Sequence, residues 1–590
     1  MSKETVVGKA FDMKILRRIY AFTKPYKKKF YLSVGLTLLL AFLSPLRPIL
    51  IQYTVDEYII KLDEAGLGKM MLLMIALLLF QTFIQYIHTY LTNWLGQTVI
   101  KDLRVKLFRH IAKLRLKYFD HTPIGTLVTR TISDLETIAD IFSEGLIVII
   151  GDLLQLAVII AVMFYKDWRL TLISLCTIPI LMVATRIFKY GINKTFREVR
   201  TQVAALNTFV QEHITGMSIV QIFNREEEEM KRFRKINNEH MKANVRSVWY
   251  YSIFFPVVEL LSAASIGLLV WWGSGGVITH DVSLGNVIAF IMFINMLFRP
   301  IRELADKFNT LQMGMVSSER VLKVLDTEEF IEDKGTLETE IKGSIRFENV
   351  WFAYNEAKDT ENTEWILKDV SFEINAGETL ALIGATGAGK SSIINLVGRM
   401  YEFQKGRIMI DGIDIRNFNL NALRKQVAVV LQDVFLFSDT IYNNITLNDN
   451  TISLDKVKEA SQAVGANVFI DRLPGKYDFN VMERGAMLSV GQRQLISFIR
   501  AYVFKPSILI LDEATSSIDS ESEELIQKAT ATLTKGRTSI VIAHRLATIQ
   551  NADKIIVMDH GKVIEQGNHQ ELLKQDGLYK ELYDIQFRNS

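Results

Sequence analysis

Long apolar runs fill the first half of the chain, whereas beyond about residue 345 apolar residues alternate with charges in short stretches. A membrane-spanning helix needs about 20 predominantly apolar residues. Runs of this kind occur near residues 30–55, 70–95, 143–165, 168–190, 250–273 and 284–305. The pattern therefore predicts an all-α membrane domain with six spans, followed by a domain of short strands and helices.

Basic residues mark alternate connections between these spans. Lys and Arg are frequent at the N-terminus and after the second and fourth spans, whereas the loop near 274–283 has neither and the loop near 56–69 is acidic on balance. The positive-inside rule then places the N-terminus, both long connections and everything after the sixth span in the cytoplasm. Helical periodicity continues through 97–117 and 194–212, so we expect these helices to project beyond the bilayer.

Some charged residues fall within the predicted spans, among them Arg47, Asp152, Glu259 and Arg299. Charges that face lipid are costly, so we expect these side chains to face the protein interior, with Arg299 paired to an acid on a neighbouring helix. Two roles stay open for them, structural pairing between helices and direct contact with a transported substrate.

The bulk composition excludes several other classes of protein. A chain of 590 residues is too long for one hydrophobic core. The net charge of only +3 gives no sign of a nucleic-acid partner. Cys176 is the single cysteine, so the chain has no internal disulfide framework and no CxxC metal or redox site.

A glycine-rich segment follows an apolar run in the second half. Residues 380–383 (LALI) predict a buried strand, and residues 384–391 read GATGAGKS before an amphipathic helix. This G-x-x-x-x-G-K-[ST] pattern is typical of a phosphate-binding loop, in which backbone N–H groups converge on a nucleotide's phosphates. Lys390 would reach the β- and γ-phosphates, and Ser391 would ligate Mg²⁺. The candidate nucleotide-binding residues of this segment are Gly384, Ala385, Thr386, Gly387, Ala388, Gly389, Lys390, Ser391 and Ser392.

Two later apolar strands end in polar residues. Residues 508–511 (ILIL) lead into Asp512 and Glu513, and residues 539–543 lead into His544. The carboxyl ends of parallel strands face the ligand crevice of such a sheet. We therefore expect Asp512 to hold Mg²⁺, Glu513 to activate the attacking water and His544 to contact the γ-phosphate.

Further segments carry a resemblance to the ABC superfamily. Residues 488–494 (LSVGQRQ) look like its signature, and the LDEATSSID run from Leu511 to Asp519 resembles its Walker B segment and D-loop. Gln432 in VVLQDVFLF resembles the Q-loop residue, and Tyr354 resembles the residue that stacks on adenine. Residues 117–138 and 212–226 look like the two cytoplasmic loops of half-size ABC exporters. The resemblance covers most of the chain and is to lipid A flippase-like transporters and bacterial multidrug exporters.

This resemblance implies a reaction and a partner. In the family, two ATP molecules lie between the phosphate loop of one subunit and the signature of the other, and their hydrolysis drives alternating access. A second half-transporter and the cofactors ATP and Mg²⁺ are therefore implied. The implied catalytic residues are Glu513, His544 and Gln432, the Mg²⁺ ligands are Ser391, Gln432 and Asp512, and the further ATP contacts are Tyr354, Ser489, Gly491 and Gln492.

The resemblance also implies the organisation of the chain. We expect a transmembrane domain at 1–325, a linker at 326–344 and, at 345–590, an α/β P-loop nucleotide-binding domain with an antiparallel β subdomain. The expected substrate is a hydrophobic or amphipathic molecule, a lipid or a drug, moved across the cytoplasmic membrane of a bacterium. A regulatory ABC protein would be expected to lack Glu513 or His544, and an importer-type or soluble ABC ATPase would not carry six fused spans.

One position departs from the family pattern. The usual signature is LSGGQ, and Val490 stands here at its first glycine. A β-branched residue restricts the backbone where glycine is free, so we expect some loss of quality at this site. An identical partner chain is our first expectation, and this departure leaves a heterodimer with a different half-transporter open.

Overall fold

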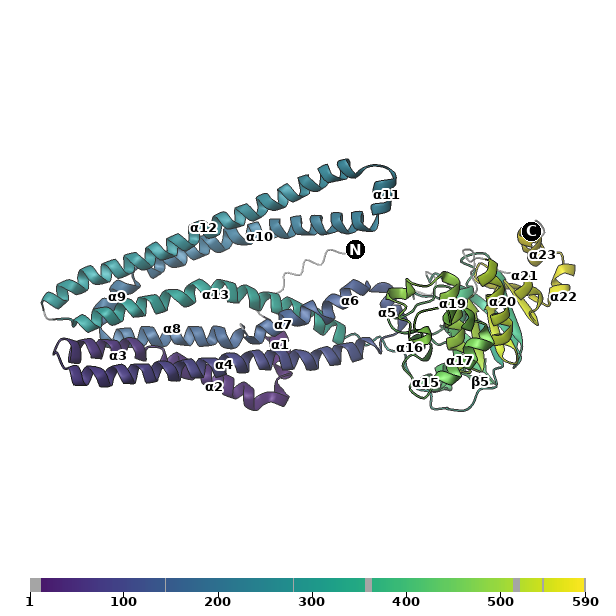
Figure 1. Cartoon of the computed structure of the whole chain (residues 1–590), viewed down its shortest axis with the longest axis horizontal. Helices are drawn as coiled ribbons and strands as arrows, with labels where there is room; N and C mark the ends of the chain where they lie inside the picture. Colours follow the sequence, from purple (N-terminus) through teal and green to yellow (C-terminus); the bar gives the residue numbers. More distant parts are fainter. Residues whose placement is uncertain are drawn as a thin grey trace. The chain divides into compact units, whose positions relative to one another are not determined.

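A computed structural model of the chain describes residues 12–143, 145–279, 281–355, 363–512, 520–543 and 546–587. The chain divides into two compact units (Figure 1). The helical unit comprises Met1–Ala112 and Ile124–Thr327, and the α/β unit comprises Lys113–Pro123 and Glu328–Ser590. A short segment between two helices of the helical unit, residues 113–123, thus belongs to the α/β unit.

The helical unit is built almost entirely from α-helices. In chain order these are α1 (Met13–Ala21), α2 (Lys27–Leu43), α3 (Leu46–Thr54), α4 (Glu64–Ile111), α6 (Ile124–Thr131), α7 (Ser133–Ser143), α8 (Leu146–Lys166), α9 (Trp168–Leu175), α10 (Ile178–Thr215), α11 (Met217–Ile222), α12 (Glu226–Ile278) and α13 (Leu284–Leu325). Short 3₁₀ and π turns at Lys24–Tyr26 and Val55–Ile59 join α1 to α2 and extend α3.

Within the described residues, five helical stretches are long and apolar enough to cross a membrane: Lys24–Ile59, Glu64–Ile111, Ile124–Lys166, Trp168–Thr215 and Glu226–Ile278. The sixth predicted span corresponds to a shorter apolar stretch, Leu284–Pro300, at the start of α13. At a rise of 1.5 Å per residue, α4 and α12 are about 70 and 80 Å long, more than twice the ~30 Å apolar core of a bilayer. Both helices therefore extend well past the membrane.

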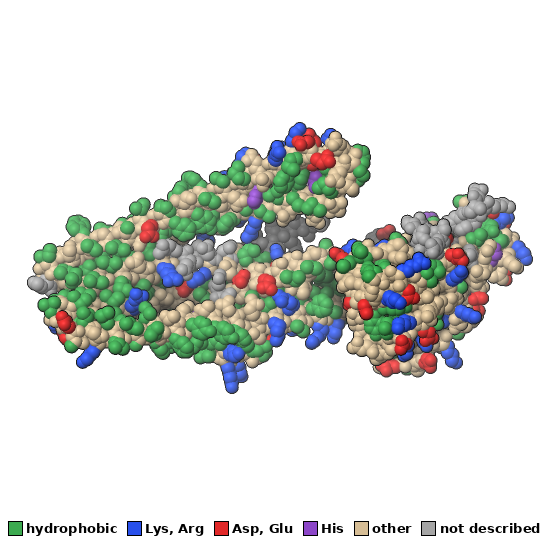
Figure 2. Space-filling view, viewed as in Figure 1, with side chains coloured by type: hydrophobic (Ala, Val, Ile, Leu, Met, Phe, Trp, Pro, Cys, Tyr) green, Lys and Arg blue, Asp and Glu red, His purple; other side chains and the backbone are tan. Residues whose placement is uncertain are grey.

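Helices α10 and α12 pack side by side as a long hairpin with α11 at its tip (Figure 1). At the opposite end of the hairpin, α12 contacts α9 and α13, and the hairpin diverges from α13 toward α11. The space-filling view shows the molecule hollowed between this hairpin and the rest of the helical unit (Figure 2). The space between this hairpin and α13 is thus widest at the α11 end (Figure 1).

Polar side chains inside the helical unit form pairs between helices. Lys307 Nζ of α13 donates to Asp152 Oδ2 of α8 at 2.6 Å, and these side chains are only 18% and 20% exposed. Thr37 of α2 and His88 Nε2 of α4 lie 2.8 Å apart in a buried contact. The structure thus pairs Asp152 with a cation that sequence reasoning did not single out. Glu259 and Arg299 have exposed side chains in the single chain, and the partner expected for Arg299 stays a prediction.

The α/β unit contains two sheets. Its strands are β1 (Ile345–Phe352), β2 (Leu367–Ile374), β3 (Thr379–Gly384), β4 (Lys405–Ile410), β5 (Ile413–Asp414), β6 (Val427–Val430), β7 (Ile508–Asp512), β8 (Thr538–Ile542), β9 (Lys554–Asp559) and β10 (Lys562–Gly567). Strands β2-β1-β4-β5 form an antiparallel sheet. The second sheet has the order β10-β9-β3-β8-β7-β6, in which β10 is antiparallel to β9 and the other pairs are parallel.

Helices cover these sheets and complete the unit. They are α5 (Leu116–His121), α14 (Lys390–Val397), α15 (Leu420–Gln426), α16 (Ile441–Thr446), α17 (Leu454–Val464), α18 (Asn467–Ile470), α19 (Val490–Val503), α20 (Ser520–Thr534), α21 (Leu546–Gln550), α22 (His569–Lys574) and α23 (Leu578–Phe587). The predicted fold class, a helical membrane domain followed by an α/β domain with an antiparallel sheet, is confirmed.

The α/β unit has separate hydrophobic cores. One core joins the antiparallel sheet to β3 and α14, with Ile393 and Ile394 buried in it. A second core joins β6 and β7 to the helical region around α17 and α19, with Leu495 and Ile496 buried there. The segment that follows β3 and the start of α19 are therefore held by different parts of the unit.

We predict that Lys307→Ala lowers the stability of the helical unit, because it leaves the mostly buried carboxylate of Asp152 without its cation. The expected loss in free energy of unfolding is about 1–3 kcal/mol. It is measured by thermal unfolding of the purified full chain in detergent.

The exchanged pair Asp152→Lys with Lys307→Asp should recover most of this loss. Lys242→Ala, which removes an exposed ion pair with Glu239, is the matched control and should change little. A Lys307→Ala protein as stable as the unmodified chain would rule out a structural role for the pair.

Candidate nucleotide site

The predicted phosphate loop connects the end of β3 to the start of α14. Gly384 and Gly389 have φ values of 151° and 101°, in the region that L-residues rarely adopt. A Cβ atom on Gly384 would lie 2.2 Å from the carbonyl oxygen of Met558, and one on Gly389 would lie 2.7 Å from Leu367 Cδ2. The loop therefore requires glycine at both ends, and it directs its backbone into the N-terminus of a helix, where anions bind.

Lys390 is the first residue of α14, and it is buried. Its Nζ donates hydrogen bonds to the carbonyl oxygens of Gly384 and Ala385, at 2.7 and 3.0 Å. Burial lowers the pKa of the Lys390 ammonium group, and the negative charge of Asp512 opposes this lowering. The loop thus places a buried cation within the field of the predicted Mg²⁺ ligand, an arrangement that suits a nucleotide's phosphates and their metal ion.

Strand order brings the predicted polar residues to one edge of the sheet. Asp512 ends β7, which pairs in parallel with β6 on one side and with β8 on the other. Val430 pairs with Leu511, so Gln432, two residues further along, leaves the sheet beside Asp512 with an exposed side chain. Carboxylate, amide and hydroxyl oxygens are the ligands that Mg²⁺ prefers, so Asp512, Gln432 and Ser391 suit this ion.

Some of the predicted site falls outside the described residues. These positions are Glu513, His544 and the D-loop Ser516–Asp519. Their predicted roles therefore stay predictions.

Tyr354 follows β1 and lies beside the first turns of α14. Its ring makes edge-to-face contacts with Phe352 and Tyr401, with ring centroids 4.8 and 5.0 Å away. Its hydroxyl group lies 3.1 Å from Ser392 Oγ and accepts a hydrogen bond from Asn395 Nδ2 at 3.4 Å. The aromatic ring predicted to stack on adenine is therefore fixed against the helix that starts at the phosphate loop.

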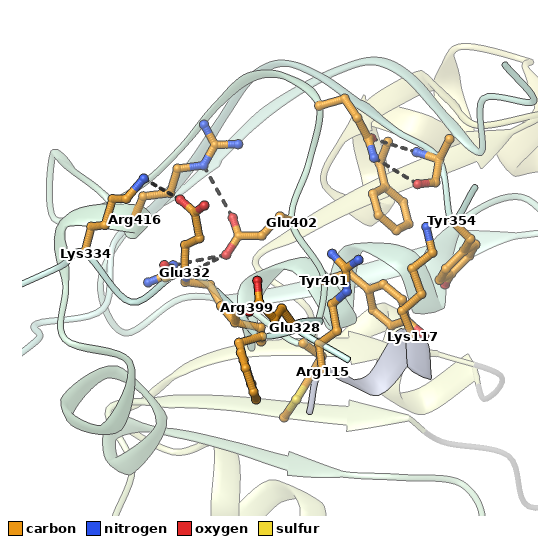
Figure 3. Close-up of a pocket in the computed structure, with 16 residues that line it drawn as sticks. Arg115, Lys117, Glu328, Glu332, Lys334, Tyr354, Arg399, Tyr401, Glu402 and Arg416 are labelled. Carbon is orange, nitrogen blue, oxygen red and sulfur yellow. Dashed lines mark hydrogen bonds and ion pairs between the residues drawn. The ribbon is translucent and has the colours of Figure 1, made fainter. Parts of the chain in front are cut away.

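Tyr354 also lines a cavity of 840 Å³ (Figure 3). Arg115 and Lys117 of the segment 113–123 also line this cavity, and Lys117 lies at the same end of it as Tyr354 (Figure 3). Arg115 N–H donates to the Glu329 carbonyl oxygen at 3.0 Å, and the Tyr401 hydroxyl group donates to the Asp120 carboxylate. Sequence reasoning identified a cytoplasmic loop here, but it missed Asp120 and Tyr401 because no local pattern connects two residues so far apart in the chain.

The predicted signature forms the start of α19. Ser489 is its N-cap: Ser489 Oγ accepts from the Gln492 N–H at 3.2 Å, and Gln492 Oε1 accepts from the Ser489 N–H at 3.0 Å. Val490 is the first helical residue, its side chain is exposed, and its φ is not positive. A β-branched side chain is therefore accommodated without backbone strain at this position, and its effect on the ATP site stays a prediction. Gly491 is buried in the first turn.

Comparisons with known proteins agree with this geometry. The family described as "ABC transporter transmembrane region" matches residues 30–301, and the family described as "ABC transporter" matches residues 367–516. An ATP-dependent lipid A-core flippase of Desulfotalea psychrophila is 35% identical over 581 residues, which cover 98% of this chain and 100% of that protein. The chain belongs to the half-size ABC exporters.

Other relatives of this exporter are bacterial too. The uncharacterized ABC transporter ATP-binding protein YknV of Bacillus subtilis is 38% identical over 590 residues, covering 99% of this chain and 97% of that protein. The "Probable multidrug resistance ABC transporter ATP-binding/permease protein YheH" of the same species is 37% identical over 513 residues, covering 86% and 75%. The exporter is thus a multi-pass membrane protein whose ABC domain binds ATP, and as a half-transporter it pairs with a second chain.

We predict that Tyr354→Ala weakens ATP binding by about 1–3 kcal/mol, because the base loses its stacking surface. Tyr354→Phe and Tyr354→Trp keep an aromatic face and should bind ATP nearly normally. The measurement is equilibrium binding of a fluorescent ATP analogue to the purified exporter.

The Phe variant doubles as a control, because it removes only the hydrogen bonds to Ser392 and Asn395. Equal weakening by Ala and Trp would contradict stacking and would assign the ring to packing against Phe352 and Tyr401.

Proposed function

We propose that this exporter moves a hydrophobic or amphipathic molecule, a lipid or a drug, out of the cytoplasmic membrane by alternating access. The observation that carries the proposal is the segment 113–123, which leaves a membrane-spanning helix and joins the unit that holds the phosphate loop. Such a segment transmits a change at the nucleotide to the helices. The relatives named for lipid A-core and multidrug transport support this class of substrate.

In the proposed reaction, adenine stacks on Tyr354 and the phosphates bind in the loop. Lys390 binds the β- and γ-phosphates, and backbone N–H groups of Gly384–Ser392 surround them. Mg²⁺, when bound, neutralises the phosphate charge that develops during hydrolysis. Ser391, Gln432 and Asp512 would hold this ion.

Hydrolysis needs a base and a second signature. Glu513 activates the attacking water, and His544 contacts the γ-phosphate. Ser489, Gly491 and Gln492 of a second subunit close the site from the other side. The separate cores that hold α14 and α19 support this arrangement, because the phosphate loop and the signature of one chain are anchored in different parts of the α/β unit.

We propose a homodimer as the active form, with a different half-transporter as the alternative. The chain contains a complete set of candidate site residues, and Val490 occupies a helical position without a positive φ, which supports pairing of two identical chains. We further propose that residues 1–325 form the membrane domain and 345–590 the nucleotide-binding domain, joined by a linker at 326–344. The N-terminus and the nucleotide-binding domain would lie in the bacterial cytoplasm.

The test of this function is the purified chain, reconstituted alone into liposomes. We expect a dimer with Mg²⁺-dependent ATP hydrolysis that candidate lipids or drugs stimulate. Glu513→Gln should bind ATP normally but lose a factor of about 100 or more in turnover, the loss typical of removing a general base. Normal turnover in this variant would refute the assignment of Glu513. Hydrolysis that appears only after a different half-transporter is added would establish the heterodimer instead.

The hydrogen bond between Tyr401 and Asp120 makes the proposed transmission testable. Tyr401→Phe keeps the aromatic contact with Tyr354 and removes only the hydroxyl group that donates to Asp120. We predict ATP affinity close to that of the unmodified exporter, because the lost hydroxyl group donates to Asp120 and is not an expected ATP contact. Substrate-stimulated ATPase should be lost.

The paired control is Tyr442→Phe, which removes a hydroxyl group that donates to the Ile452 carbonyl within the α/β unit. This variant should keep its stimulation by substrate. Unchanged stimulation in Tyr401→Phe would show that the hydrogen bond does not transmit the nucleotide's state.

A further inference from the structure

The helical unit contains a second cavity, of 650 Å³, at the end of the hairpin opposite α11. The turn between α8 and α9 forms one side of it, and the last turns of α12 with the connection to α13 form the other. Helix α9 lies beside α12 at this end of the unit (Figure 1). Its lining includes Lys166, Trp168, Arg169, Trp271, Trp272 and Asp281.

Charge distribution places this cavity at the outer face of the membrane. The long connections rich in Lys and Arg follow the second and fourth spans, whereas the α8–α9 turn follows the third and the α12–α13 connection follows the fifth. The positive-inside rule puts these two connections on the side away from the cytoplasm. The cavity therefore lies where lipid headgroups of the outer leaflet meet the protein.

The acidic side chains of the cavity already accept hydrogen bonds. Asp167 Oδ1 accepts the backbone N–H groups of Arg169 and Leu170, at 2.8 and 3.1 Å, and thereby caps α9. Asp281 Oδ2 accepts the Thr279 hydroxyl group at 3.0 Å. Both carboxylates therefore already accept hydrogen bonds from groups of the protein other than the side chains of Lys166 and Arg169.

The two cations of the cavity, Lys166 and Arg169, form no ion pair among the residues that the structure describes. Lys166 is half-buried, and its ammonium group forms no ion pair or hydrogen bond within the described residues. The Arg169 guanidinium group lies 5.7 Å from the centroid of the Trp168 ring, and no described carboxylate forms an ion pair with it. Arg and Lys bind phosphate oxygens strongly through charge-assisted hydrogen bonds, so this side of the cavity suits a phosphate group.

The other side of the cavity is aromatic. Trp271 and Trp272 come from the last turns of α12, and their side chains are 79% and 43% exposed. Tryptophan is favoured at the level of lipid headgroups because its ring is apolar and its N–H group is polar. An inorganic anion would leave these rings in water, whereas the glycerol and upper acyl carbons of a lipid would cover them.

We propose that this cavity binds a phospholipid of the outer leaflet, with its phosphate on Lys166 and Arg169 and its glycerol region against Trp271 and Trp272. Such a site holds one lipid at the outer end of the α8–α9 turn, beside the hairpin formed by α10 and α12. It goes beyond the proposed export reaction, because binding there needs neither ATP nor a transported substrate.

The test counts lipids bound to the purified, delipidated full chain by native mass spectrometry during titration with phosphatidylglycerol. In the double variant Lys166→Ala with Arg169→Ala, the tightest lipid should bind about tenfold or more weakly, because two charge-assisted contacts are lost. The exchange Lys166→Arg with Arg169→Lys should keep the affinity within about threefold. Lys69→Ala is the matched control, an exposed lysine on the same side that does not line the cavity, and it should bind lipid normally.

Three results would overturn the proposal. Unchanged lipid affinity in the double variant would remove Lys166 and Arg169 from the site. An equal loss in Lys69→Ala would assign the lipid to a general belt of interfacial charges. Displacement of the lipid by inorganic phosphate would indicate a site for free anions. If the double variant loses its basal ATPase, Arg169→Gln, at an exposed position, replaces it and must weaken binding for the proposal to stand.

Discussion

The α/β unit depends on one close approach between two backbones. The end of β3 passes the carbonyl oxygen of Met558 on β9 so closely that a single Cβ atom on Gly384 would overlap it. Because the two backbones lie so close together, the chain can turn sharply from β3 into α14. In this kind of loop the backbone N–H groups converge on the phosphate position. Lys390, at the start of that helix, is then buried where its charge meets the field of Asp512. A site for the phosphates of ATP follows from this turn.

The same site is connected to the membrane-spanning helices by a short piece of chain. Residues 113–123 leave α4, join the α/β unit and contact it through Arg115 and Asp120. Asp120 accepts from Tyr401, whose ring meets the edge of Tyr354. The ring proposed to stack on adenine is thereby two contacts away from the segment 113–123. This short series of contacts supports the proposed coupling of hydrolysis to transport.

The structure of the helical unit depends on a different constraint, which is that its backbone polar groups need hydrogen-bond partners inside the lipid bilayer. Backbone polar groups cannot stay unpaired in hydrocarbon, so the apolar runs form helices that satisfy them internally. Some polar side chains in these helices are paired across helices, as with Asp152 and Lys307, and others lie at the ends of spans, as with Lys166 and Arg169. The end of the unit opposite α11 thus gathers cations and tryptophans around one cavity, the site that we propose for a lipid.

The sequence by itself determined the elements and the motifs. Spans, buried strands and the phosphate loop are visible because hydrophobic periodicity and glycine placement act over a few residues, and the polar residues after β7 follow from the same local rules. Only the tertiary structure decided the pairs Asp152–Lys307 and Asp120–Tyr401, because each joins residues whose proximity depends on how distant helices pack. It also showed that Val490, which stands where the family pattern has glycine, lies in a helical backbone. A β-branched residue adopts helical backbone angles without a steric clash, so Val490 fits there with an exposed side chain.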